Sequence, residues 1–297
     1  MSRLPRVDFT RIFFFDFVCP IIHFLFLISY EMSEIIYTAI ILGLVEGLTE
    51  FLPVSSTGHL IIASSILQIH DEGIKIVEIA IQTGAILAVC VLYPGQFLKL
   101  LSFKELASFS GKRGLFLLGV AISPALIFGF FAHDFIKSYL FHPITVGIGL
   151  VLGSILMLWV EIRKTNQNGS SFEWINFRRA LVIGLYQCLS LWPGFSRSAA
   201  TICGGMLSGL NRKTAAEFSF FLAVPIILAA TTWDLFKNYQ LINDSEIWII
   251  LLGGMLSFVF AIYSIRLFVH FINQINLKIF AVYRLILATC IFIFYYP

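Results

Sequence analysis

Residues 53–58 read Pro-Val-Ser-Ser-Thr-Gly, and they interrupt an apolar region that runs from 35 to 67. A second apolar region, 180–210, is interrupted by Pro-Gly-Phe-Ser-Arg-Ser at residues 193–198. Proline and glycine break helices, and non-helical backbone is tolerated at membrane depth only where protein covers it or where it lines a wet cavity. Each region is therefore expected to form a re-entrant helical hairpin, and each tip is a candidate functional site.

The composition places these regions in a membrane. The chain has 297 residues, of which 59% are hydrophobic and 12% charged, and its mean hydropathy is +0.91. It is too apolar to present a water-compatible surface around one core. A membrane crossing needs about 20 apolar residues, and seven stretches qualify: about 12–30, 77–93, 115–132, 142–160, 218–235, 246–265 and 277–296. The expected fold is an all-α polytopic membrane protein.

The charges and cysteines exclude other classes of protein. The net charge of +3 is small, and the Lys and Arg residues are scattered between the apolar stretches. Proteins that bind nucleic acid gather their cations on one face or in one run, so we expect no nucleic-acid partner. The five cysteines lie in apolar stretches without a Cys-x-x-Cys pair, which indicates small buried hydrophobic residues: Cys19, Cys90, Cys188, Cys203 and Cys290.

The distribution of Lys and Arg residues between the loops orients the chain. If both hairpins are re-entrant and all seven stretches cross, fifteen Lys and Arg residues fall on one side and three on the other, namely Lys75, Lys137 and Lys237. Cytoplasmic loops carry the excess of positive charge in membrane proteins. The side with fifteen is therefore predicted to be cytoplasmic, and the C-terminus is predicted to lie outside.

This orientation makes the hairpins enter from opposite sides, which predicts an inverted-repeat helical bundle with repeats at about 32–160 and 175–297. Broken helices in inverted repeats typically meet at a site near the membrane midplane, where the two tips are expected to face each other. A sequence echo supports the repeat, because three residues of the first half, Gly43, Glu46 and Pro53, have counterparts in the second, Gly184, Gln187 and Pro193.

Residues 1–31 form an N-terminal extension before the first hairpin. Arginines precede an apolar run there, as in a signal peptide, but Asp16, Pro20 and His23 interrupt the run and no small-residue cleavage site follows. Two interpretations stay open. The extension is an additional transmembrane helix, or it reflects an upstream start, because the apolar helix that follows Met32 could itself begin the protein. Residues 32–297 are expected to form a single membrane domain.

Glu46 and Glu50 are four residues apart, so both carboxylates project from one face of the helix before the first break. Like charges repel there unless a proton or a cation intervenes, and carboxylates inside a membrane usually serve a function. Hard oxygen ligands at this spacing suit Mg²⁺ or Ca²⁺ beside substrate phosphates. The alternative is a helix end whose glutamates reach the lipid headgroups.

The first break gathers the hydroxyls of Ser55, Ser56 and Thr57 with the imidazole of His59. A lone histidine inside a membrane is usually packed or hydrogen-bonded, but the nearby carboxylates and hydroxyls favour a catalytic role here. Ser56 and His59, with Glu50, are therefore candidate catalytic residues. Ser55 and Thr57 are candidates for substrate binding.

Arg197 lies in the second break, where a glycine-containing loop leads into a helix N-terminus. A guanidinium offers two parallel donors to a phosphate, and the helix start adds free backbone N–H groups. Arg197 is a candidate catalytic residue, and the hydroxyls of Ser196, Ser198 and Thr201 are candidates for substrate binding. The alternative for Arg197 is a structural ion pair with one of the two glutamates.

Two long segments resemble the signature segments of undecaprenyl-diphosphate phosphatases of the bacitracin-resistance type. Residues 46–59 read Glu-Gly-Leu-Thr-Glu-Phe-Leu-Pro-Val-Ser-Ser-Thr-Gly-His, and residues 193–201 read Pro-Gly-Phe-Ser-Arg-Ser-Ala-Ala-Thr. The likeness runs from about Met32 to the C-terminus and leaves residues 1–31 outside. It matches the family's acidic pair and its other active-site positions to these residues: Glu46, Glu50, Ser56, His59, Ser196, Arg197 and Thr201.

The resemblance implies an enzyme that hydrolyses undecaprenyl diphosphate to undecaprenyl phosphate and phosphate in the bacterial cytoplasmic membrane. Such an enzyme recycles the lipid carrier of peptidoglycan synthesis and confers bacitracin resistance. The resemblance also implies a divalent cation, Mg²⁺ or Ca²⁺, and an active site that opens outward. The expected partners are the polyprenyl diphosphate and the bilayer. The sequence leaves the oligomeric state open, with a homodimer as one alternative.

The nucleophile stays open at this point. Ser56 activated by His59, His59 itself and a metal-bound water each agree with the residue types, and the first is favoured by a small margin. A polyprenyl-lipid transporter or flippase is the alternative function, because inverted repeats with broken helices are a transporter architecture. A carrier does not need a Ser, His and carboxylate cluster opposite an arginine, so the residues favour the phosphatase.

Overall fold

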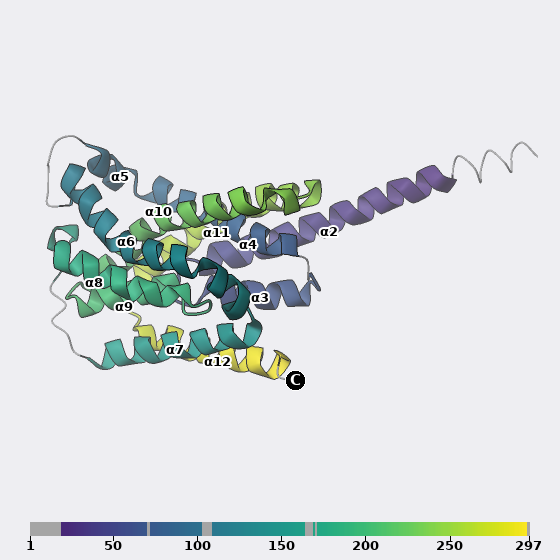
Figure 1. Ribbon diagram of the computed structural model, residues 1–297. Helices are drawn as coiled ribbons and strands as arrows, with labels where there is room; N and C mark the ends of the chain where they lie inside the picture. Colours follow the sequence, from purple (N-terminus) through teal and green to yellow (C-terminus); the bar gives the residue numbers. More distant parts are fainter. Residues whose placement is uncertain (1–18, 70–71, 103–108, 164–168, 170, 296–297) are drawn as a thin grey trace, which may run out of the picture.

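The computed structural model describes residues 19–69, 72–102, 109–163, 169 and 171–295, and its helices pack side by side into one bundle (Figure 1). The helices are α2 (Cys19–Thr49), α3 (Ser56–Ile66), α4 (Glu72–Leu92), α5 (Pro94–Leu101), α6 (Gly111–Phe135), α7 (Pro143–Ile162), α8 (Phe177–Gln187), α9 (Arg197–Leu207), α10 (Arg212–Asn238), α11 (Asp244–Phe271) and α12 (Leu277–Tyr295). No strand forms among the described residues, which confirms the all-α fold.

Six of these helices are long and apolar enough to cross a membrane, namely α4, α6, α7, α10, α11 and α12. They coincide with six of the seven predicted stretches, and most are longer by about a turn at one end or both. Asparagine caps set two of the starts, because the side chains of Asn211 and Asn243 accept hydrogen bonds from backbone N–H groups in the first turns of α10 and α11. The chain is a multi-pass membrane protein.

The predicted separate crossing at 12–30 is wrong for the part that is described. Residues 19–30 belong to α2, one continuous helix of 31 residues, so no turn separates them from the first hairpin arm. Residues 12–18 lie outside the described residues. No proline or glycine occurs between residues 21 and 42, so nothing in the sequence ends the helix there. Figure 1 shows the N-terminal part of α2 extending beyond the other helices.

A chain that begins at Met32 is expected to keep the activity that the resemblance implies, within about two-fold. Burial of α2 in the bundle is established from Ile35 onward, with Ala39 and Leu42 fully covered, and every candidate site residue lies later. The measurement is phosphate release per mole of the shortened and the full-length protein. Loss of activity in a shortened chain that reaches the membrane in normal amounts would contradict this prediction.

The two breaks share the same backbone conformation just before the helix that follows each of them. Ser55 precedes α3 with φ at 73°, and Ser196 precedes α9 with φ at 74°, so both lie in the left-handed region that side chains other than glycine rarely adopt. Each serine side chain then caps the helix that follows, Ser55 on the N–H of Gly58 and Ser196 on the N–H of Ala199. Strain of this kind concentrates at functional sites.

Corresponding helices make corresponding contacts between the two halves. Helix α2 of the first half packs on α11 of the second, α8 of the second half packs on α6 of the first, and α7 and α12 pack on each other. The close crossings need small residues, since a Cβ on Gly43 would lie 2.4 Å from the Gly253 carbonyl oxygen and one on Gly184 would lie 2.6 Å from that of Ala121. Such a pattern of contacts is what an inverted repeat predicts; the division at 32–160 and 175–297 stays a prediction.

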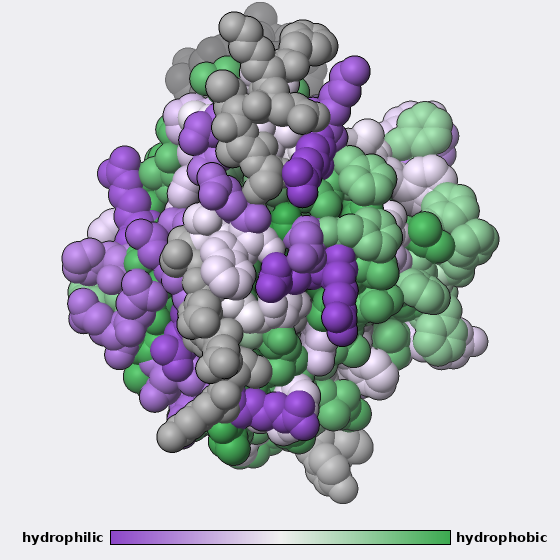
Figure 2. All heavy atoms as spheres, turned by 90° about the vertical axis from the view of Figure 1, so that its left-hand side faces the viewer, coloured by the Kyte–Doolittle hydropathy of each residue, from purple (hydrophilic) through white to green (hydrophobic). Residues whose placement is uncertain are grey.

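The hairpins themselves lie toward opposite ends of the bundle. In Figure 1, α2 and α3 occupy the right-hand part, while α8 and α9 occupy the left-hand part. Figure 2 views that left-hand end and shows many hydrophilic side chains on the left and in the centre of the view, as expected for an end that meets water, with hydrophobic side chains mainly on the right. The depth of the two hairpins in the bilayer, and thus their re-entrant character, stays a prediction.

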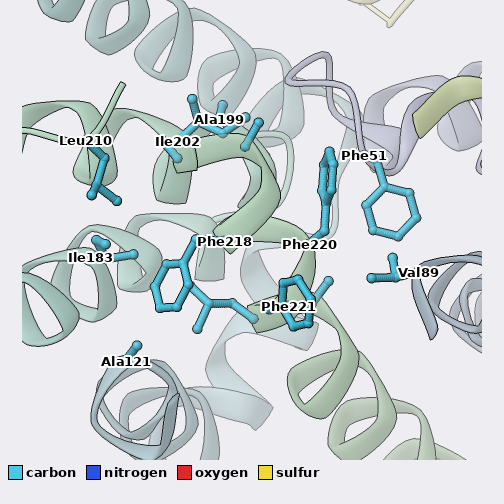
Figure 3. Packing of buried hydrophobic residues seen from close by; sticks show 14 of the residues in the cluster. Phe51, Val89, Ala121, Ile183, Ala199, Ile202, Leu210, Phe218, Phe220 and Phe221 are labelled. Carbon is cyan, nitrogen blue, oxygen red and sulfur yellow. The ribbon is translucent and has the colours of Figure 1, made fainter. Parts of the chain in front are cut away.

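Phenylalanine rings fix the first tip against the second half of the chain. Phe51, in the first tip, packs edge-on against Phe220 of α10 with ring centroids 5.2 Å apart, and both side chains are fully buried. Figure 3 shows Phe51 beside Phe220 and Phe221 in the largest hydrophobic cluster. Aromatic contacts of this kind contribute stabilisation beyond the burial of the rings, so they hold the first tip against α10.

Candidate active site

The two tips meet inside the bundle. The hydroxyl of Ser198, in the first turn of α9, donates a 2.8 Å hydrogen bond to the Leu52 carbonyl oxygen of the first tip. Nη2 of Arg197 lies 2.7 Å from Oε1 of Glu50. The prediction that the tips face each other is confirmed. The ion pair that was considered as the structural alternative for Arg197 is formed as well.

Glu50 contacts two of the other three predicted catalytic residues. Its Oε1 pairs with Arg197, and its Oε2 accepts a 2.6 Å hydrogen bond from the hydroxyl of Ser56. The side chains of Glu50 and Arg197 are only 9% and 11% exposed, so water screens the pair weakly. A serine whose proton points at a buried carboxylate is oriented to lose that proton as its oxygen attacks an electrophile.

Two of the three guanidinium nitrogens of Arg197 have hydrogen-bond partners among the described residues, and the third does not. Its Nη1 donates to the Ser219 carbonyl oxygen at 2.9 Å and lies 3.2 Å from the Ser219 hydroxyl. The Thr201 hydroxyl approaches the same Ser219 hydroxyl at 2.7 Å, so Thr201 supports the arginine indirectly. Among the described residues, Nε of Arg197 has no hydrogen-bond partner although it is buried. A phosphate oxygen would satisfy this donor.

Glu46 is fully buried, and neither of its carboxylate oxygens has a hydrogen-bond partner among the described residues. It lies one helical turn before Glu50 on α2, so the two carboxylates face the same side. A buried carboxyl group without donors suits a divalent cation, which prefers carboxylate oxygens. The described part of the chain holds no group of three His, Cys, Asp or Glu residues that could cage a metal. The chemistry of the two carboxylates fits a divalent cation, and the use of such a cation stays a prediction.

His59 makes different contacts from those expected. Its Nδ1 lies 2.7 Å from the Ser55 carbonyl oxygen, and its Nε2 lies 2.7 Å from the hydroxyl of Tyr283 on α12. The two rings also stack with centroids 5.6 Å apart. A carbonyl oxygen can only accept, so Nδ1 carries a proton. The hydroxyl of Ser56 thus points to Glu50, whereas the sequence favoured His59 as its partner.

The remaining predicted residues lie around the same point. Ser55 and Ser196 act as helix caps, and the hydroxyls of Ser196 and Ser198 are 3.0 Å apart. Because Ser198 also donates to the first tip, it joins the two hairpins directly. Thr57 is half-buried in the first turn of α3. Their roles in substrate binding stay predictions.

Sequence reasoning missed two residues of this network, Ser219 and Tyr283. Ser219 is fully buried on α10 and receives both Arg197 and the Thr201 hydroxyl. It had a weak signal, since a hydroxyl inside an apolar stretch needs a partner. Tyr283 lies in the last apolar stretch, and only the packing of α12 beside α3 brings its hydroxyl to His59.

Comparison with known proteins agrees with this geometry. The family model "Bacitracin resistance protein BacA" matches residues 39–290, which include both tips. An undecaprenyl-diphosphatase of Maridesulfovibrio salexigens is 49% identical over 260 residues, which cover 88% of this chain and 98% of that protein. An undecaprenyl-diphosphatase 1 of Bacillus anthracis is 44% identical over 263 residues, which cover 89% of this chain and 99% of that protein. The chain therefore belongs to the bacitracin resistance protein BacA family.

Proposed function

We propose that this protein hydrolyses undecaprenyl diphosphate to undecaprenyl phosphate and inorganic phosphate. The observation that carries the proposal is the hydrogen-bonded series Ser56–Glu50–Arg197 across the two tips. We assign the nucleophile to Ser56, the proton acceptor to Glu50 and the binding of phosphate to Arg197. The relatives that match nearly the whole chain are named undecaprenyl-diphosphatases. The names of these relatives indicate the substrate. The residues of the site suit the cleavage of a phosphoric anhydride.

Phosphoryl transfer is mostly a matter of positioning and of neutralising charge. In the first step, the Ser56 oxygen forms a bond to the terminal phosphorus as the bond from that phosphorus to the bridging oxygen breaks. The Ser56 proton passes to Glu50, and undecaprenyl phosphate leaves with its negative charge on the former bridging oxygen. Arg197 neutralises the charge that gathers on the transferred group, using the Nε donor that has no protein acceptor among the described residues.

In the second step, a water oxygen bonds to the phosphorus and the bond to Ser56 breaks. The Ser56 oxygen regains its proton from Glu50, and inorganic phosphate leaves with the protons of the water. Direct attack by His59 is less well placed, because both of its ring nitrogens are engaged, one by the Ser55 carbonyl and one by Tyr283. We assign His59 to holding the first tip in place beside Ser56, since its ring joins the Ser55 carbonyl oxygen to the Tyr283 hydroxyl of α12.

A divalent cation, Mg²⁺ or Ca²⁺, completes the proposal. Glu46 and Glu50 would hold it, because the buried Glu46 carboxyl group has no other partner among the described residues. When bound, such a cation supplies positive charge that stabilises the phosphate oxygens and lets two carboxylates stand side by side. Ser55, Thr57, Ser196, Ser198 and Thr201 line the surrounding tips and are proposed to orient the substrate.

The substrate's long prenyl chain keeps the reaction in the membrane, because removing it from lipid costs about 0.8 kcal/mol per CH₂ group. Together with the bacterial relatives, this supports the bacterial cytoplasmic membrane as the location, and a role in recycling the carrier lipid of peptidoglycan synthesis and in bacitracin resistance. A flippase is not favoured, because transport does not require a serine directed at a buried carboxylate. A homodimer is the alternative to a monomer, and measuring phosphate release by the isolated monomer tests whether the second copy is needed for activity.

The purified protein is expected to release phosphate from undecaprenyl diphosphate, and exhaustive chelation is expected to lower the rate at least about 100-fold. Adding back Mg²⁺ or Ca²⁺ should restore it. Glu46→Gln should raise the cation concentration needed for half-maximal rate, because it removes one of the two carboxylates. Full activity after chelation would overturn the cation assignment, and no phosphate release with either cation present would overturn the proposed function.

A further inference from the structure

Arg284 is a fully buried arginine in the middle of α12, and it has the largest side chain among the fully buried residues of the described chain. Among the described residues it forms no ion pair with a carboxylate, unlike Arg197 and Arg212, which pair with Glu50 and Glu161. An arginine at membrane depth is expensive and usually functional. Its contacts therefore need an explanation.

The guanidinium of Arg284 binds backbone carbonyls from both tips. Its Nη1 lies 3.4 Å from the Pro53 carbonyl oxygen in the first tip. Its Nη2 lies 3.1 Å from the carbonyl oxygen of Gly194 and 2.8 Å from that of Phe195 in the second. The same Nη2 also lies near two carbonyl oxygens of α7, those of Gly149 and Leu150. One side chain thus joins both tips to α7 and α12.

These carbonyls belong to the backbone that the active site depends on. Phe195 comes two residues before Arg197, and Pro53 comes three residues before Ser56. Backbone in the breaks cannot use the helical hydrogen-bond pattern, and a buried carbonyl without a donor is costly. Arg284 supplies several donors from one rigid planar group. Moving it would shift Ser56 and Arg197 relative to each other.

The neighbouring helix is shaped to admit the guanidinium. A Cβ placed on Gly153 of α7 would lie 2.1 Å from Nη2 of Arg284 and 2.7 Å from the Phe195 carbonyl oxygen. Only glycine leaves that room, so the position of the Arg284 side chain is defined by α7 as well as by the tips. By contrast, a Cβ on Gly119 of α6 would meet nothing within 4 Å.

We propose that Arg284 is a positioning residue that holds the two tips in fixed positions relative to each other, so that Ser56 and Arg197 can contact the same phosphoryl group. It does not touch the substrate, because it is fully buried. Its charge, which no carboxylate among the described residues neutralises, adds positive potential beside a site for a diphosphate. This inference rests on the proposed function, and it assigns the alignment of that site to a residue of the last helix.

The first test uses phosphate release from undecaprenyl diphosphate by Arg284→Lys and Gly153→Ala. Lysine keeps the charge but cannot reach carbonyls on both tips at once, and alanine displaces the guanidinium without altering it. Both variants are expected to lower kcat about 100-fold, as for misplacement of reacting groups by about 1 Å. The matched control Gly119→Ala should stay within about two-fold of the wild-type protein.

The second test separates positioning from general stability. Arg197→Lys, which weakens but keeps the phosphate-binding charge, is combined with Arg284→Lys and separately with Arg212→Met. Arg212 is an arginine that ties α10 to Glu161, away from the tips. The effects on kcat should be strongly non-additive for the Arg284 pair and additive for the Arg212 pair, because only neighbours in one network couple.

The outcomes are distinct for the two proposals. Absence of phosphate release by the wild-type protein would count against the proposed function and not against Arg284 alone. An active wild-type protein whose Arg284→Lys and Gly153→Ala variants keep their kcat would overturn the positioning role. The positioning role would also be overturned if the effects on kcat were additive for both the Arg284 and the Arg212 combinations, with matching losses of thermal stability. Arg284 would then contribute to stability alone.

Discussion

Glu50→Gln is expected to lower the rate of phosphate release at least about 1,000-fold while the protein still folds and inserts. Glutamine keeps the size of the side chain and can still accept the hydrogen bond from Ser56, but it cannot take up the serine proton. It also removes the negative partner of Arg197 and one of the two carboxylates proposed to hold the cation. Three contributions to one site are therefore lost in a single change.

The measurement is kcat for purified protein with saturating undecaprenyl diphosphate and divalent cation. Glu161→Gln is the matched control, because the Glu161 carboxylate is also buried and also paired with an arginine, Arg212, but lies away from the tips. This control should lower thermal stability and leave kcat nearly unchanged. Near-normal turnover by Glu50→Gln would place the proton acceptor elsewhere and remove the main support for Ser56 as nucleophile.

The parts of this site that could be predicted from the sequence are those whose chemistry is local. The proline and glycine breaks and the carboxylates four residues apart are properties of short segments. The cost of charge at membrane depth then made it possible to predict that Arg197 meets the acidic pair, although 147 residues separate Arg197 from Glu50. The bond between Arg197 and Glu50 confirms that argument.

The partners of individual side chains could not be predicted in the same way. Both Glu50 and His59 are close to Ser56 in sequence, and only the turn at the first tip, with Ser55 at positive φ, directs the Ser56 hydroxyl to Glu50. Tyr283 approaches His59 because α12 packs against α3, which no local pattern reveals. Tertiary packing decides such pairings.

Arg284 and α2 show two further limits. The cost of an intramembrane arginine could have drawn attention to Arg284, but its partners are backbone carbonyls, which leave no trace in the pattern of side chains. For α2, a crossing of ordinary length was expected to end near residue 30, yet no proline or glycine ends the helix there. Length alone was a poor guide to that boundary.

Arg197→Ala is expected to reduce phosphate release at least about 1,000-fold, because it removes the cation that neutralises the transferred phosphoryl group. The loss should exceed that of Arg197→Lys, since lysine keeps a point charge but loses the planar pair of donors. Arg179→Ala is the matched control, because Arg179 also donates to backbone carbonyls, those of Ser208 and Trp174, outside the site.

Arg197→Ala also leaves Glu50 buried without its counter-charge, and an unpaired buried carboxylate is costly. Part of the lost rate could therefore come from a displaced Glu50 and not from lost contact with phosphate. The double variant Arg197→Ala with Glu50→Gln separates the two causes, because the amide needs no counter-charge. If the arginine acts on the phosphate, the double variant is slower than Glu50→Gln alone, although its thermal stability recovers. Equal residual rates of the double variant and of Glu50→Gln alone would show that Arg197 serves only to hold Glu50, and that the phosphate is bound by other groups.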